Sequence, residues 1–89
     1  MSGGRTIVFA PEAAQEFDAL DPVVRGRVER ALDQVATNPI AVRGQIKRLR
    51  GDPALRLRVG DWRIIFEPRR DEIVVLAIAH RREVYRSEP

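Results

Sequence analysis

The sequence predicts an α+β fold in which an N-terminal strand and a helical hairpin precede an antiparallel β-meander of three or four strands. Three observations lead to this prediction. Apolar residues recur at helical spacing over residues 11–37, they alternate with charged residues later in the chain, and proline or glycine marks the changes of pattern. Because the chain has 89 residues and no repeat or linker, residues 1–89 are expected to form a single domain.

The first half of the chain predicts one strand and two helices. Residues 6–10 are rich in β-branched and aromatic side chains, as strands are. Pro11 suits the first turn of a helix, because its missing N–H costs nothing there. Asp21 and Pro22 are expected to begin the second helix as N-cap and first helical residue, and the Asn-Pro pair at 38–39 ends it. Two helices joined by a tight turn form a hairpin.

The second half predicts the meander. Leucine or valine alternates with arginine over residues 55–59, which is typical of a strand buried on one face. Arg56 and Arg58 are therefore expected to project from the sheet face opposite the helices. Strands are also expected at 62–67 and 72–80, with turns at 60–61 and 68–71. For residues 46–49, a short strand and a loop both stay open as alternatives.

Composition excludes several kinds of site and location. The chain has no cysteine and one histidine, which rules out disulfides, thiol nucleophiles and Cys/His zinc sites. It has no phosphate-binding glycine loop and no metal-ligand cluster, so no cofactor or metal is expected. The longest apolar run is too short to span a membrane, and the N-terminus lacks a secretory signal, so a cytoplasmic location is expected.

The positive charge is concentrated in the middle of the chain. The formal net charge is +3, yet residues 40–63 hold seven bases and two acids, whereas residues 5–37 hold four bases and six acids. Such a basic segment indicates an anionic partner, with phosphate the commonest candidate. The alternative is a solvated, arginine-rich face.

A candidate site is expected where two strands of the meander meet. Arg63 begins one strand, while His80 and Arg81 end the next, so these side chains are expected to lie near each other. Arginines stabilise charge on a phosphorus-centred transition state, and His80 and Tyr85 offer two proton-transfer groups. Each of these residues also has a structural alternative. Arg63 would pair with a nearby glutamate, and His80 would be hydrogen-bonded within the fold. Tyr85 would anchor the tail, and Trp62 would lie in the core or stack on a base.

Four stretches, taken in combination and in order, resemble the RelE/ParE superfamily of bacterial toxin–antitoxin toxins along nearly the whole chain. They are the hairpin ending at 38–39, Lys-Arg-Leu-Arg-Gly at 47–51, Leu-Arg-Val-Gly-Asp-Trp-Arg-Ile-Ile-Phe-Glu at 57–67, and His-Arg-Arg-Glu-Val-Tyr at 80–85. The resemblance implies the RelE/ParE toxin fold and a RelE-like toxin that cleaves mRNA in the ribosomal A site. It also implies a protein antitoxin as partner, and a metal-free attack of the ribose 2′-hydroxyl on the neighbouring phosphate.

The resemblance also implies residue roles. Arg63 matches the family's arginine after the aromatic residue of the turn, and Arg81 resembles the arginine near the chain end. Both would stabilise the charged phosphorane, while Tyr85 or His80 would transfer the proton. The residues expected to bind RNA are Lys47, Arg50, Arg56, Arg58 and Arg82.

Two other functions stay open. One is a ParE-like toxin that inhibits DNA gyrase without cutting RNA, since a shared fold does not decide the function. The other is a degenerate toxin kept as a binding module, which is allowed by Arg56 and Arg58 standing where some members carry lysines.

Overall fold

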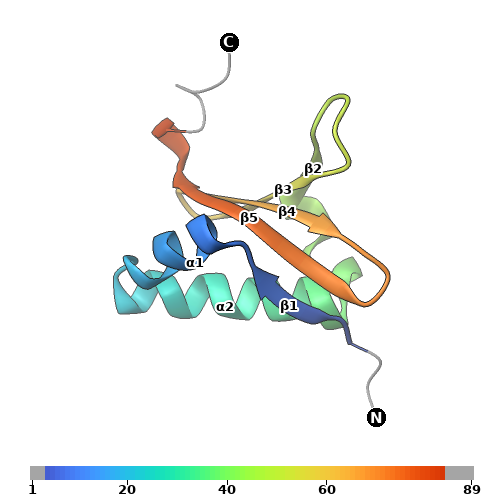
Figure 1. The fold of residues 1–89 in the computed structure, drawn as a ribbon, viewed down its shortest axis with the longest axis horizontal. Coiled ribbons are helices and arrows are strands. Elements are labelled where there is room, and N and C mark those ends of the chain that lie inside the picture. Colours follow the sequence, from blue (N-terminus) through green and yellow to red (C-terminus); the bar gives the residue numbers. More distant parts are fainter. Residues whose placement is uncertain (1–3, 84–89) are drawn as a thin grey trace.

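The computed structural model describes residues 4–83 and confirms the predicted α+β fold (Figure 1). The elements in chain order are β1 (Thr6–Phe9), α1 (Pro11–Asp18), α2 (Pro22–Thr37), the 3-10 helix η1 (Pro39–Gln45), β2 (Ile46–Arg48), β3 (Leu55–Val59), β4 (Trp62–Pro68) and β5 (Glu72–His80). The five strands form one sheet in the order β1-β5-β4-β3-β2. Strand β1 runs parallel to β5, and the other pairs are antiparallel, so β2–β5 are the four-stranded version of the meander.

The helices begin where proline predicts them to begin. Pro11 and Pro22 occupy first-turn positions, and Asp21 is the N-cap residue of α2, although its side chain makes no capping hydrogen bond. Helix α2 ends at Thr37, as the Asn-Pro pair predicts, and η1 follows it directly. The sequence did not predict η1, which carries the chain from α2 to the edge strand β2.

The hydrophobic core lies between α2 and one face of the sheet, which we call the inner face. Its fully buried members on the strands include Leu57, Ile64, Phe66 and Ile73, and α2 contributes Val28 and Leu32. Register places Leu57 opposite Ile64, so these side chains share a face. In the part of the chain that the structure describes, no helix is long and apolar enough to cross a membrane.

The opposite, outer face of the sheet carries the charged members of the same strands. Arg58 is exposed and Arg56 half-buried, whereas Leu57 between them is fully buried. The alternation predicted for residues 55–59 is therefore confirmed. The register of β4 with β5 shifts between Ile65 and Phe66, which inserts one extra residue into β5.

Helix α1 lies beside the edge of β5 beyond the end of β1 (Figure 1). The carboxylate of Glu16 accepts a hydrogen bond from the backbone N–H of Ile78, with an oxygen–nitrogen distance of 2.7 Å. The last backbone pair of β1 with β5 is Phe9 with Val75, so Glu16 supplies an acceptor where the neighbouring strand has ended.

Candidate nucleic-acid interface

Four cationic side chains gather on the outer face of β2, β3 and β4. The register sets Lys47 opposite Arg56 and Arg58 opposite Arg63. Directly opposed side chains on one sheet face lie about 5 Å apart at Cβ, and like charges in such pairs repel each other. The sequence-predicted residues Lys47, Arg56, Arg58 and Arg63 thus form one positive surface that favours an anion.

Arg63 is the most enclosed of these cations, with only 9% of its surface exposed. Its Nη1 donates hydrogen bonds to the carbonyl oxygens of Gly60 (2.9 Å) and Trp62 (3.0 Å). The predicted alternative, a pair with a nearby glutamate, is not the arrangement seen: Glu67 binds Arg69 instead, at 3.1 Å. The guanidinium is held by the β3–β4 turn through these two hydrogen bonds.

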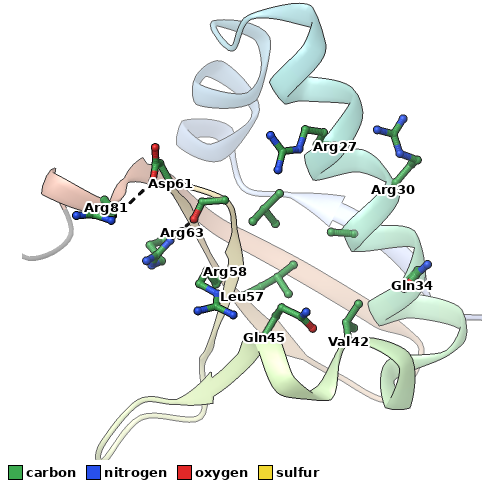
Figure 2. A pocket seen from close by; sticks show the side chains of 13 residues that line it. Arg27, Arg30, Gln34, Val42, Gln45, Leu57, Arg58, Asp61, Arg63 and Arg81 are labelled. Carbon is green, nitrogen blue, oxygen red and sulfur yellow. Dashed lines mark hydrogen bonds and ion pairs between the residues drawn. The ribbon is translucent and has the colours of Figure 1, made fainter.

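The turn at Gly60 and Asp61 brings together arginines from three elements. Gly60 has φ +60°, a left-handed conformation that glycine adopts without strain, and a Cβ there would lie 3.3 Å from Nη2 of Arg27. The backbone N–H of Arg81 donates to the carbonyl of Asp61 (2.7 Å), and the two side chains form an ion pair at 3.7 Å. Arg27, Arg63 and Arg81 therefore surround one turn (Figure 2).

These arginines line a cavity that we call the arginine groove, which opens between α2, η1 and the β3–β4 turn (Figure 2). It has a volume of about 680 Å³. Its charged lining residues are Arg27, Arg30, Arg58, Asp61, Arg63 and Arg81. The predicted neighbours Arg63 and Arg81 thus lie in one cavity. Neither Arg27 nor Arg30 was singled out from the sequence as a site residue.

A sequence signal for these two arginines does exist. Arg27, Arg30 and Gln34 flank the apolar stripe of α2 at spacings of three and four residues, so they lie on one side of the helix. A cation beside an apolar stripe lies at the rim of the surface that packs on the sheet. Such a position can reach a neighbouring strand end.

The structure does not bring His80 together with Arg63. His80 pairs in register with Trp62, whereas Arg63 pairs with Ala79, and adjacent residues of a strand point to opposite faces. The imidazole packs edge-on against the half-buried Trp62, with ring centroids 5.4 Å apart. The expected proximity of His80 to Arg63 is therefore wrong.

His80 instead caps the helical residues 81–83 that follow β5. Its Nδ1 accepts from the backbone N–H of Arg82 (3.3 Å), while the carboxylate of Glu83 accepts from the backbone N–H of His80 (3.0 Å). This reciprocal pair has the pattern of a capping box. The geometry favours the structural alternative, a hydrogen-bonded histidine within the fold.

The remaining predicted residues lie apart from the groove or outside the described range. Arg50 is exposed in the β2–β3 loop, and Arg82 is exposed on the helical residues after β5. Tyr85 lies outside the described residues. Among residues 4–83, no group of three or more His, Asp or Glu side chains could hold a metal ion. The described site can bind phosphate and stabilise negative charge through guanidinium groups.

Comparison with known proteins identifies the family. A family model described as the ParE toxin of type II toxin-antitoxin systems, parDE, matches residues 7–85. No protein among those with curated descriptions matches the chain.

Solved structures with the same fold include both RelE and ParE toxins. One is the RelB–RelE complex of Methanococcus jannaschii (23% identity, TM-score 0.73, covering 92% of this chain and 99% of that one). A second is the RelE–RelB complex of Pyrococcus horikoshii (18% identity, TM-score 0.74, covering 88% of this chain and 96% of that one). A third is the chromosomal ParDE system of P. aeruginosa (14% identity, TM-score 0.65, covering 89% of this chain and 98% of that one). Because the family model covers most of the sequence, the chain belongs to the ParE toxin family of type II toxin–antitoxin systems, within the RelE/ParE superfamily.

Proposed function

We propose that this toxin cleaves mRNA on the ribosome as a metal-free endoribonuclease and so inhibits translation. The observation that carries the proposal is the position of Arg63, which is fixed by two carbonyl groups beneath a surface shared with Lys47, Arg56 and Arg58. A preorganised cation in an enclosed site stabilises developing negative charge without reorganising during the reaction.

The proposed reaction needs no group beyond the RNA and the protein. The ribose 2′-oxygen attacks the adjacent phosphorus, and the bond from phosphorus to the 5′-oxygen breaks, leaving a 2′,3′-cyclic phosphate and a 5′-hydroxyl. Arg63 and Arg81 stabilise the phosphorane from the arginine groove, and Arg56 and Lys47 hold the backbone on the outer face. The 2′-hydroxyl proton leaves to a base, and the 5′-oxygen receives a proton.

We assign this proton transfer to Tyr85 rather than to His80. The imidazole of His80 lies against Trp62 on the side of β5 opposite to Arg63, and its Nδ1 is engaged in the capping box. Tyr85 follows two residues after Glu83 and matches the C-terminal tyrosine that the family resemblance implies. This assignment predicts that Tyr85→Phe reduces cleavage more than a conservative change at His80 does.

Primer-extension mapping of mRNA after brief induction tests the proposal. We expect new cuts inside translated reading frames, lost in Arg63→Ala and weakened in Tyr85→Phe. Arg70→Ala is the matched control, because this exposed arginine lies in the β4–β5 turn, at the other end of the strands from the arginine groove. Intact mRNA under wild-type induction would refute the ribonuclease.

The second candidate function is inhibition of DNA gyrase, and the match to the ParE family model favours it. This function predicts intact mRNA, growth arrest and a DNA-damage response on induction. A supercoiling assay with purified gyrase would then show inhibition by the wild-type toxin. A toxin that neither cuts mRNA nor inhibits gyrase would be a degenerate binding module.

We also propose a protein antitoxin as partner. The similar structure from Methanococcus jannaschii is an antitoxin–toxin complex of RelB with RelE, and the one from Pyrococcus horikoshii is a RelE–RelB complex. In this chain, large apolar side chains stay exposed on the hairpin and on η1, with Val23 69% and Ile40 76% exposed. A helix of the antitoxin that covers an apolar or basic surface would stabilise so small a domain. Expression of a soluble, stable and harmless toxin without any partner would contradict this.

A further inference from the structure

The arginine groove is continuous with the basic outer face of the sheet. Strand β2 pairs with β3 at Leu55–Leu57, so Arg58 and Val59 have no partner on β2. Arg58 and Arg63 line the arginine groove and also a smaller hollow that they share with Lys47 and Arg56. A chain-like ligand can therefore pass from the outer face, past the shared Arg58 and Arg63, to α2.

The groove holds more positive charge than its own acids compensate. Five arginines line it against one aspartate, and the carboxylate of Asp61 is already paired with Arg81. The guanidinium of Arg27 lies against Gly60, whose carbonyl accepts from Arg63, so these two cations meet at one glycine. Like charges at such range repel each other in the free protein, and a bound anion relieves this repulsion.

Continuity with the outer face decides which anion fits best. Proteins that bind single-stranded nucleic acid use a positively charged groove that follows the backbone. Arg63 belongs both to this groove and to the proposed cleavage site, so a strand held at Arg63 has its next phosphates within the groove. Arginine binds phosphate through a planar fork of donors.

We propose that the RNA backbone runs from the outer face through the arginine groove onto α2, where Arg27 and Arg30 bind its phosphates. This inference rests on the proposed ribonuclease function. It assigns to α2 a binding role in addition to its packing role. Arg27 and Arg30 hold the strand on one side of the scissile phosphate and take no part in the chemical step.

The test measures binding separately from cleavage. The probe is a fluorescein-labelled single-stranded RNA of about 12 nucleotides in which every 2′-oxygen is methylated, so that no 2′-hydroxyl can attack. Anisotropy titrations give Kd between about 50 and about 200 mM salt. For the double variant Arg27→Gln and Arg30→Gln we expect a Kd raised roughly tenfold or more, and a salt slope reduced by about 1.4, because each lost phosphate contact on a single strand removes about 0.7.

The matched control carries Arg5→Gln and Arg70→Gln, which remove the same charge elsewhere. Arg5 precedes β1 and Arg70 lies in the β4–β5 turn, at the other end of the strands from the groove. We expect this variant to bind the probe like the wild type. Equal losses in the two double variants would overturn the proposal, since the effect would then follow total charge alone.

Three results separate this inference from the proposed function. Weaker probe binding in the Arg27/Arg30 variant supports the groove path even if the wild type cuts no mRNA, in which case only the ribonuclease fails. Unchanged Kd and salt slope in that variant overturn the groove path while wild-type cleavage persists. Unchanged RNA binding with lost antitoxin binding also overturns it, and makes the groove a docking surface for an acidic antitoxin segment.

Discussion

The inner and outer faces of the sheet use the same strands for opposite purposes. On the inner face Leu57 and Ile64 are fully buried against the helices, while on the outer face their chain neighbours Arg58 and Arg63 form a positive pair. Side chains alternate strictly along a strand, so one residue separates the core from the binding surface. Stability and binding can therefore be changed almost independently in this small domain.

Arg63 is the exception that connects the two faces. It points to the outer face, yet it is 9% exposed, and it binds the carbonyl groups of the turn that orders β3 and β4. A buried, hydrogen-bonded cation is costly to place and is easily disturbed. Such a residue links binding to the local fold, whereas the exposed Arg58 does not.

The largest expected effect on stability follows from the loss of an inner-face aromatic side chain. Phe66→Ala should lower the free energy of unfolding by about 3–5 kcal/mol, because the ring is 1% exposed and its loss leaves a cavity. Chemical denaturation followed by circular dichroism measures this change. Arg58→Ala on the outer face is the comparison and should stay within about 0.5 kcal/mol of the wild type. Similar losses in both variants would mean that the outer face also contributes to the core.

The next effect is on activity. Arg63→Ala should reduce cleavage of ribosome-bound mRNA by about 10²–10³-fold, because a preorganised cation is lost from the proposed transition state. Its cost in stability should be smaller, about 1–3 kcal/mol, from the carbonyl groups left without this donor. Cleavage assays and denaturation on the same preparation separate the two. Arg63→Lys retains the charge without the planar fork, so activity restored by lysine would show that charge alone suffices.

Much of the difference between the two faces of the sheet could be predicted from the sequence, because it depends on short-range patterns. The leucine and arginine alternation over residues 55–59 assigned the two faces, and Pro11 and Pro22 located the helix starts. These signals act within a few residues and need no knowledge of register. The outward direction of Arg56 and Arg58 was therefore predicted correctly.

What could not be predicted depends on register and on tertiary packing. The meeting of two strand ends was foreseen, but a shift of one residue decides whether His80 faces Arg63 or Trp62. The uniformly apolar strand β5 carries no alternation that would fix this choice. The position of Arg27 against Gly60 is set by how α2 packs on the sheet, which local sequence does not specify.

A smaller effect is expected where α1 meets the edge of the sheet. Glu16→Ala removes the acceptor for the Ile78 N–H and should lower the free energy of unfolding by about 1–3 kcal/mol. Glu16→Gln retains an oxygen acceptor and should lose less. Hydrogen exchange at the Ile78 amide reports the contact directly, and it should quicken in Glu16→Ala. An unchanged exchange rate would mean that α1 protects this edge by packing alone.

The smallest expected effect distinguishes the two interpretations of His80. Asparagine is a good N-cap residue, so His80→Asn can keep a side-chain acceptor for the Arg82 N–H, whereas His80→Ala loses it. We expect the alanine variant to lose about 0.5–2 kcal/mol of stability and the asparagine variant less.

If His80 only caps the helical residues 81–83, His80→Asn should retain cleavage activity. If its imidazole transfers a proton, both variants should lose activity equally, because neither side chain can act as a base near neutral pH. Activity that falls only when the cap is lost would identify His80 as a structural residue that caps the helical residues 81–83.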